Sequence, residues 1–368
     1  MKKHYRIRVR GAFVGRDMEF IGKDLCIETI DDTIFIQDAS RCMGDFIDCE
    51  CIAVPLPLNM HVHVLDNIIP EYSINADVDK AVGGPDSEKH RLLSKYSEIL
   101  DSVVSVACNS MRHYRYGGLV EFRERLSKDL IKARCRKPYV HIILGRGYDK
   151  ESINNVYEFY DGLGLPTPLA YSIELLRYMR EKKPGGKIIV THVAETLTAR
   201  INGDLEIAVK YLKPDFVVHG NYLSRSDIDL LAKNSINIVI CPRNTLWFGL
   251  RIPDIKYMLE SNIVLGIGTD NAGLQGLDLW AAIQDLVYLT RLRKTRINYR
   301  DLAVSVFTKP YSILKIGEIQ EETLEDIGLA LINDGTTRIR FSRNPWLSLM
   351  KRTSSADVLG VIYPNTTQ

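Results

Sequence analysis

The sequence predicts an α/β protein, a distorted (β/α)8 TIM barrel joined to a small β-sandwich domain that both chain termini build. Three observations support this fold class. From about residue 52, short apolar runs alternate with longer helical stretches, which is typical of a parallel sheet covered by helices. Metal-type side chains follow several of these runs, as expected at the mouth of a barrel. Strand-like alternation appears at both ends of the chain, so we expect the two ends to share one β domain.

The N-terminal strands are indicated by alternation with a period of two. Tyr5, Ile7 and Val9 alternate with arginines, the pattern of a strand with one solvated face. Short strands are expected to follow at 25–27 and 33–36. Barrel strands are then predicted at 52–60, 119–123, 138–144, 160–165, 187–192, 215–219, 236–241 and 263–269. Eight strands are the number that a closed barrel of this type needs.

Helices are predicted between these strands. One runs from Ser172 to Lys183 and ends at Pro184-Gly185-Gly186, and another begins at the capping box Ser224-Arg225-Ser226-Asp227. The segment near 64–118 is too long for a simple connection, so we expect it to supply a helical lid over the mouth.

The C-terminal part is predicted to return to strands at 328–332, 338–341 and 358–362. We therefore divide the chain into a composite β domain, residues 1–51 and 317–368, and a metal-dependent barrel, residues 52–316.

The composition indicates an ordinary globular protein, with 45% apolar and 26% charged residues. The net charge is only +2 and no basic tract stands out, which argues against a nucleic-acid polymer or a membrane as partner. The seven cysteines lack the spacing of a disulfide scaffold, so we expect thiols in a reducing cytoplasm. Cys49 and Cys51 are interpreted in the same way, as thiols in a strand.

Candidate metal ligands begin with His61 and His63. Residues i and i+2 of a strand project to the same side, so these two imidazoles can bind one ion. A single His-x-His is equally compatible with two packed histidines. Further apolar runs are closed by His192, His219 and Asp270. The joint placement at strand ends favours a metal site over ordinary packing.

These segments resemble the amidohydrolase superfamily, in particular the branch of guanine, cytosine and S-adenosylhomocysteine deaminases and triazine chlorohydrolases. The resemblance spans roughly residues 50 to 350 and is carried by His61-Val62-His63, His192-Val193-Ala194-Glu195, His219-Gly220-Asn221-Tyr222-Leu223-Ser224 and Gly268-Thr269-Asp270-Asn271-Ala272. Asn344-Pro345-Trp346 resembles the closing β segment of the family.

The resemblance implies one divalent metal ion, with zinc favoured and Fe²⁺ or Mn²⁺ as alternatives. Its implied ligands are His61, His63, His192 and Asp270. A bound cation lowers the pKa of its water from 15.7 to about 7. Asp270 is then expected to accept the proton of that water, Glu195 to pass a proton to the ring nitrogen and leaving group, and His219 to polarise the group under attack.

A single metal is expected because relatives with two metals hold them through a carboxylated lysine at the end of the fourth strand. The predicted fourth strand, 160–165, contains no lysine.

The predicted substrate contacts are less constrained. Relatives often carry Pro-x-Ser-Asn after the seventh strand, whereas this chain has Pro242-Arg243-Asn244-Thr245. Arg243 and Asn244 are candidate substrate contacts, and an arginine at this position suits either a carboxylate or phosphate ligand or simple solvation. Trp247 and Arg112 are further candidates, the former as an aromatic wall.

The function predicted from these residues is metal-dependent hydrolysis. Deamination of an amino-substituted nitrogen heterocycle by a metal-bound hydroxide is favoured, with a purine, pyrimidine or nucleoside-type substrate. The alternatives are an amidohydrolase or chlorohydrolase acting on a cyclic amide, an N-acyl group or a carbon–halogen bond, and a non-catalytic scaffold. The resemblance also suggests a homodimer or a larger homo-oligomer.

Overall fold

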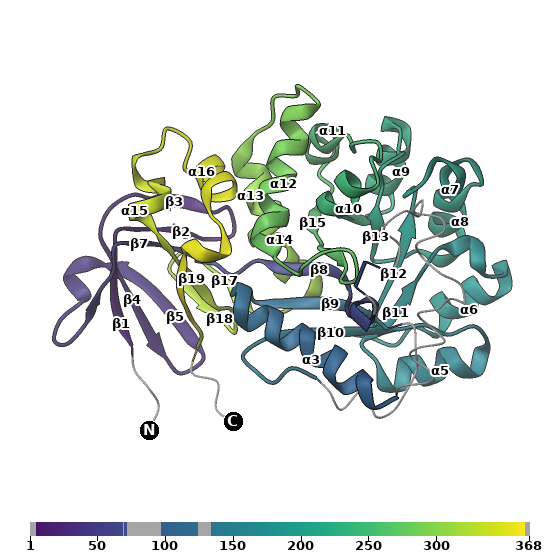
Figure 1. The fold of residues 1–368 in the computed structure, drawn as a ribbon, viewed down its shortest axis with the longest axis horizontal. Coiled ribbons are helices and arrows are strands. Elements are labelled where there is room, and N and C mark those ends of the chain that lie inside the picture. Colours follow the sequence, from purple (N-terminus) through teal and green to yellow (C-terminus); the bar gives the residue numbers. More distant parts are fainter. Residues whose placement is uncertain (1–4, 69, 72–96, 124–133, 365–368) are drawn as a thin grey trace.

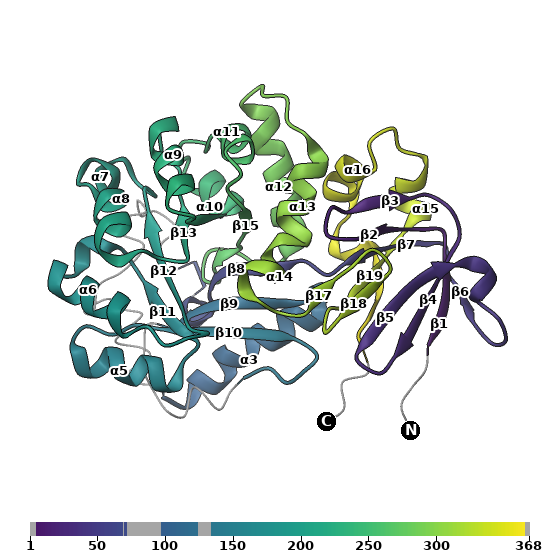
Figure 2. The same ribbon diagram turned by 180° about the vertical axis from the view of Figure 1, so that it is seen from behind.

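The computed structural model describes residues 5–68, 70–71, 97–123 and 134–364 (Figure 1). The strands form three sheets, of which one closes into a barrel and two are built from the terminal segments. Seen from the front and from behind, the terminal sheets lie at one end of the molecule, beside the barrel (Figure 2).

The barrel consists of parallel strands that pair in chain order, and β15 returns to pair with β8. Its strands are β8 (Leu58–His63), β9 (Gly118–Arg123), β10 (Val140–Gly145), β11 (Gly162–Leu165), β12 (Ile188–Val193), β13 (Phe216–His219), β14 (Asn237–Ile240) and β15 (Leu265–Ile267), followed by the short β16 (Asp270–Asn271). The predicted (β/α)8 barrel is confirmed. Each predicted barrel strand overlaps an observed one.

Helices cover the outside of the barrel (Figure 1). The described helices of the barrel are α3 (Ser97–Tyr114), α5 (Lys150–Phe159), α6 (Ile173–Lys182), α7 (Leu197–Ile201), α8 (Asp204–Ile207), α9 (Arg225–Lys233), α10 (Pro242–Trp247), α11 (Ile255–Glu260), α12 (Leu279–Leu292), α13 (Tyr299–Phe307) and α14 (Lys309–Leu314). Ser172 caps α6 and the Ser224–Asp227 capping box begins α9, as the sequence predicts. Among the described residues, no helix is long and apolar enough to cross a membrane.

The predicted lid falls largely on residues 72–96, which lie outside the described part of the chain. The described remainder of that segment is the 3₁₀ turn η2 (Val64–Ile68) and α3. Ala107 and Met111 of α3 pack with Val62 and Leu119 of the barrel strands. This helix therefore covers the outer surface of the barrel.

The terminal sheets combine strands from both ends of the chain. The six-stranded sheet contains β17 (Glu318–Ile319), β18 (Thr323–Glu325), β5 (Thr33–Asp38), β4 (Leu25–Ile30), β1 (Arg6–Val9) and β6 (Ile47–Asp48). The five-stranded sheet contains β20 (Val358–Ile362), β19 (Leu329–Asn333), β7 (Cys51–Pro55), β2 (Gly11–Val14) and β3 (Glu19–Ile21). Strand β19 pairs with β7 along residues 51–55, which joins the C-terminal segment to the N-terminal one.

The run predicted as one strand at 52–60 is two strands. Residues 51–55 belong to the five-stranded sheet, and the barrel begins at Leu58. Pro55 and Pro57 lack the N–H that a continuous ladder requires, so the chain leaves one sheet and enters the other between them. His61 and His63 consequently lie inside β8 and not after it.

Two C-terminal predictions are also wrong. The segment predicted as a strand at 338–341 contains the 3₁₀ turn η5 (Ile339–Phe341), which follows α15 (Asp334–Thr337) and a left-handed Arg338. Asn344-Pro345-Trp346 is not a closing β segment, because Asn344 caps α16 (Pro345–Arg352) and Pro345 occupies its first turn. Proline at that position loses no helical hydrogen bond, and so favours a helix start.

The cysteines differ from the sequence prediction. Disulfides join Cys26 to Cys42, Cys49 to Cys51, and Cys108 to Cys135. The expectation of thiols is therefore wrong for these six, and only the buried Cys241 is free. Spacing alone gave no sign of the pairing because two of the bridges join separate elements.

Candidate metal centre and active site

The candidate residues gather at the carboxyl ends of the barrel strands. An irregularity in the pairing of β8 with β9, between Asn59 and Val62, changes the side-chain alternation of β8. Met60 packs with inward-facing Val120 and Phe122, whereas Val62 packs with the outer helices. His61 and His63 therefore both face the barrel interior, where the ring of His61 lies 4.5 Å from that of Phe122.

Three other candidate side chains lie at or directly after a residue with left-handed backbone conformation. Ala194, which precedes Glu195, has φ +50°, and His219 and Asp270 have φ +75° and +64°. Such conformations are uncommon outside glycine and occur mainly where the surrounding structure fixes them, often at functional sites. Asp270 also pairs with Val62 through β16, which places it beside the two histidines of β8.

The four predicted metal ligands converge. His192 Nε2 lies 3.2 Å from His61 Nε2 and 3.3 Å from His63 Nε2. Asp270 Oδ1 lies 3.2 Å from His61 Nε2 and 3.7 Å from His63 Nε2. Ligand atoms about 2.0–2.1 Å from a tetrahedral zinc ion would be about 3.4 Å apart, so the observed spacing fits such an ion.

The protonation states of the histidines suit cation binding. His192 Nδ1 donates to the carbonyl of Leu165 at 2.9 Å, which leaves Nε2 with its lone pair toward the cluster. Burial lowers the pKa of His61 to about 3. Burial, assisted by His61, lowers the pKa of His192 to about 3 as well. Neutral imidazoles and one carboxylate that face the same point form a set of ligands suited to a divalent cation.

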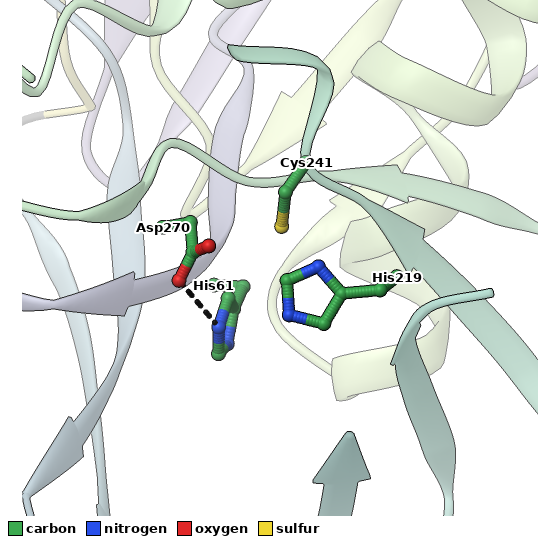
Figure 3. Close-up of side chains that lie close together, drawn as sticks. All are labelled: His61, His219, Cys241 and Asp270. Carbon is green, nitrogen blue, oxygen red and sulfur yellow. Dashed lines mark ion pairs between the residues drawn. The ribbon is translucent and has the colours of Figure 1, made fainter. Parts of the chain in front are cut away.

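His219 and Cys241 face the same space from β13 and from the end of β14 (Figure 3). Ligand atoms of His61, His219, Cys241 and Asp270 all lie within 4.8 Å of one another. Burial holds the pKa of His219 well below its usual value. Burial, with the charges of Asp270 and Glu195, raises the pKa of Cys241 well above its usual range.

Glu195 lies beside this cluster and is held by a residue of α10. Asn244 Nδ2 donates to Glu195 Oε1 at 3.0 Å, and Glu195 Oε2 lies 3.6 Å from His219 Nε2. Asn244 is 3% exposed. The structure therefore joins Asn244 to Glu195, a contact that no pattern in the sequence indicates.

A cavity of about 290 Å³ adjoins Glu195 and His192. Its walls come from the loop after β11, which supplies Pro166 and Leu169, and from α7, which supplies Ala199. The cavity thus reaches the histidine cluster at His192.

The remaining predicted substrate contacts are not brought to this cavity. Arg243 Nε donates to Asp285 Oδ2 of α12 at 3.2 Å. Trp247 ends α10 and is 47% exposed. Arg112 is exposed near the end of α3, where its charge acts on Tyr139, just before the start of β10. Arg112 therefore lies at the amino end of the barrel strands, opposite the mouth.

Three residues near the site were not predicted. Cys241 and Arg146 directly follow barrel strands, so their position at strand ends was an available signal. Arg146 is 6% exposed and its charge adds to the lowering of the His192 pKa. Asp204, 1% exposed, gave no sequence signal because it begins the short helix α8 and does not follow a barrel strand.

No family model matches the sequence. An uncharacterised protein of Methanocaldococcus jannaschii is 28% identical over 354 residues, 86% of this chain and 87% of that protein. A 5-methylthioadenosine/S-adenosylhomocysteine deaminase of Thermococcus onnurineus is 24% identical over 259 residues, 64% of this chain and 57% of that enzyme.

Similar solved structures have the same fold. Guanine deaminase from C. acetobutylicum, with bound guanine, matches with a TM-score of 0.81 at 13% identity over 99% of both chains. Atrazine chlorohydrolase from Arthrobacter aurescens, in complex with zinc, matches with a TM-score of 0.75 at 14% identity over 98% of this chain and 96% of that one. The resemblance that the sequence motifs carry is confirmed to this extent: the chain shares the fold of a guanine deaminase and of an atrazine chlorohydrolase, and it is similar in sequence to a 5-methylthioadenosine/S-adenosylhomocysteine deaminase.

Proposed function

We propose that this protein is a metal-dependent hydrolase that deaminates an amino-substituted nitrogen heterocycle of the purine, pyrimidine or nucleoside type. The observation that supports this most is the position of Glu195. Its carboxylate lies between Asn244 and His219, beside the converging histidines and next to the cavity. A carboxyl group placed there suits proton transfer to a substrate bound in the cavity.

We propose that His61, His63, His192 and Asp270 hold one divalent metal ion, with zinc favoured over Fe²⁺ or Mn²⁺. Three imidazoles and one carboxylate suit zinc, and their spacing agrees with its bond lengths. When bound, the ion would lower the pKa of a neighbouring water molecule to about 7.

The side chains divide the proton transfers between them. Asp270 accepts a proton from the attacking water as the new C–O bond forms. Glu195, protonated at the start, gives its proton to the ring nitrogen next to the reacting carbon, then takes the proton held by Asp270 and passes it to the amino group. It recovers a proton from the new hydroxyl group, which becomes the carbonyl of the product. The exocyclic C–N bond breaks and ammonia leaves. His219, neutral because of burial, lies beside Glu195 and polarises the group under attack.

The cavity limits the size of the substrate. At about 290 Å³ it is at the lower end of the range for small-molecule sites and suits one heterocycle with a small substituent. Pro166 and Leu169 offer apolar contacts for the faces of such a ring.

The test is ammonia release by zinc-loaded protein from aminopurines, aminopyrimidines, nucleosides and amino-triazines. We expect turnover that is lost after chelation and reduced about 10²-fold or more by Glu195→Gln. The same variant should retain its metal, since Glu195 is outside the proposed ligand set. Full activity of Glu195→Gln would contradict the proton-transfer role. If metal-loaded protein released ammonia from none of these compounds, an amide or carbon–halogen substrate would be favoured.

A further inference from the structure

Asp204 is a buried carboxylate with a specific backbone partner. It is the first residue of α8 and only 1% of its surface is exposed. Its Oδ2 accepts a hydrogen bond from the backbone N–H of Ala194 at 2.6 Å. Ala194 directly precedes Glu195, so this bond acts on the residue that connects β12 to the proposed proton-transfer group.

Ala194 determines the direction in which Glu195 points. In an extended strand, side chains alternate between the two faces, so Glu195 would share the face of Val193. Val193 packs in the outer cluster, away from the barrel interior. Ala194, with φ +50°, interrupts the alternation. Glu195 can then contact Asn244 and His219 at the mouth.

The turn at Ala194 is held on both sides. Gly220 N–H donates to the Val193 carbonyl and Tyr222 N–H to the Ala194 carbonyl, both at 3.0 Å. These bonds come from the loop that follows His219. Asp204 supplies the bond on the other side, to the N–H of Ala194.

A carboxylate at this place is costly for the fold. Burial raises the pKa of Asp204, while the N–H groups of Ala194 and Leu205 lower it. A neutral acceptor would satisfy the Ala194 N–H with less loss of solvation, but a charged acceptor makes a shorter and stronger bond. The short bond indicates that the turn is held firmly.

We propose that Asp204 is a positioning residue for Glu195. Its hydrogen bond fixes the left-handed conformation of Ala194 and thereby turns the Glu195 carboxylate toward Asn244 and His219. This inference rests on the proposed role of Glu195 in proton transfer.

The first experiment compares Asp204→Ala and Asp204→Asn by steady-state kinetics and metal analysis. We expect Asp204→Ala to lower kcat roughly tenfold or more with a nearly unchanged KM and full metal content. Asp204→Asn keeps a neutral acceptor, so its decrease in kcat should be several-fold smaller than that of Asp204→Ala. Combining Asp204→Ala with Glu195→Gln should give no loss beyond that of Glu195→Gln alone. An equal loss in both backgrounds would overturn the proposal.

Asp334 offers a matched control. It is 2% exposed and its Oδ1 accepts the backbone N–H of Arg340 at 3.1 Å, in the terminal part of the chain. Asp334→Ala should lower the melting temperature while leaving kcat unchanged. If Asp204→Ala does not fold, Asp204→Leu, which also removes the acceptor but fills the space, replaces it, and an unchanged kcat in Asp204→Leu would overturn the proposal.

A crystal structure of metal-loaded Asp204→Ala separates this inference from the proposed function. We expect the contact of 3.0 Å between Glu195 Oε1 and Asn244 Nδ2 to be lost, with the four proposed ligands in place. An unmoved Glu195 would overturn the positioning role. A displaced Glu195 in a protein that deaminates nothing would support the positioning role and contradict the deaminase proposal.

Discussion

At the scale of single residues, the candidate site depends on left-handed backbone conformations, which are uncommon for residues other than glycine. Ala194, His219 and Asp270 all have positive φ and all lie where a barrel strand ends. Each such residue costs about 1–3 kcal/mol, which the rest of the fold must offset. The presence of three such residues at the mouth supports a functional role for these strand ends.

The amide of Asn244 should matter through Glu195. Asn244→Ala removes the donor to Glu195 Oε1, and we expect kcat to fall by more than fivefold while the metal stays bound. The measurement is steady-state kinetics with metal analysis. The control is Asn234→Ala, which removes an amide donor to the Leu230 carbonyl at the end of α9. A change in KM alone would instead indicate that Asn244 contacts the substrate.

The buried imidazoles predict how the stability of metal-free protein depends on pH. Burial lowers the folded-state pKa of His61 and His192 to about 3, and that of His219 well below 6.5. Between about pH 6.5 and 3 the unfolded chain therefore binds protons that the folded chain does not. Stability should rise with pH across this window and be lost as pH falls. Each histidine contributes at most about 1.4 kcal/mol per pH unit.

Urea midpoints of chelated protein between pH 7.5 and 5 measure this dependence. His219→Asn should reduce the slope, whereas replacement of the exposed His113 by Gln should not. An equal slope in all three proteins would show that the buried histidines are not its source. The comparison stops at pH 5 because carboxylates begin to titrate below it.

The sequence predicted the residues of the histidine cluster because each is near the end of an apolar run. It did not predict the partners of Glu195. Asn244 is 49 residues away and meets Glu195 only when β12 and β14 are ordered around the barrel. Asp204 acts on a backbone N–H, for which no residue pattern exists.

At the scale of elements, the closure of the barrel brings the proposed ligands together. Asn59 of β8 bonds twice to Thr269, its Nδ2 to Oγ1 at 2.8 Å and its Oδ1 to the backbone N–H at 3.0 Å. Both residues are fully buried. Asn59 lies two residues before His61, and Thr269 directly precedes Asp270, so this pair sets the separation of two proposed ligands.

Asn59→Ala should therefore weaken metal binding as well as folding. Loss of the side chain leaves two buried groups of Thr269 without this partner, at about 1–3 kcal/mol each. We expect lower metal affinity in competition with a chelator. Gln284→Ala, which removes a bond from α12 to the Thr353 carbonyl, should lower stability alone. Unchanged metal affinity in Asn59→Ala would show that the strands hold their register without this pair.

Strands were predictable where an apolar run ended in a turn, as in 215–219, which overlaps β13 almost completely. The boundary between β7 and β8 was not, because the apolar run continues through both strands and both are buried. The C-terminal errors have a similar cause. Arg338-Ile339-Arg340-Phe341 alternates like a strand, but its left-handed first residue follows a helix and starts a tight turn.

At the scale of the whole molecule, contacts between distant parts of the sequence join the two chain ends and the barrel. Strand β19 pairs with β7, and β18 with β5. Trp346 Nε1 donates to the Met18 carbonyl at 2.8 Å, and Thr308 Oγ1 of the last barrel segment donates to the Arg16 carbonyl at 2.7 Å. Unfolding of either terminal segment would therefore expose part of the other.

The disulfides add covalent links to this arrangement, and they predict both a thiol count and a loss of stability on reduction. Denatured protein should show one reactive thiol, Cys241, without reductant and seven after reduction. The bridges Cys26–Cys42 and Cys108–Cys135 close loops with sequence separations of 16 and 27 residues. In the chain-entropy description such loops stabilise by about 3 and about 3.5 kcal/mol, so reduction should lower the melting temperature by several degrees. The double variant Cys108→Ser/Cys135→Ser lacks only one bridge, so its melting temperature should fall by less than that of the fully reduced protein. Seven reactive thiols in unreduced protein would instead support the prediction, drawn from cysteine spacing, that the cysteines are free thiols.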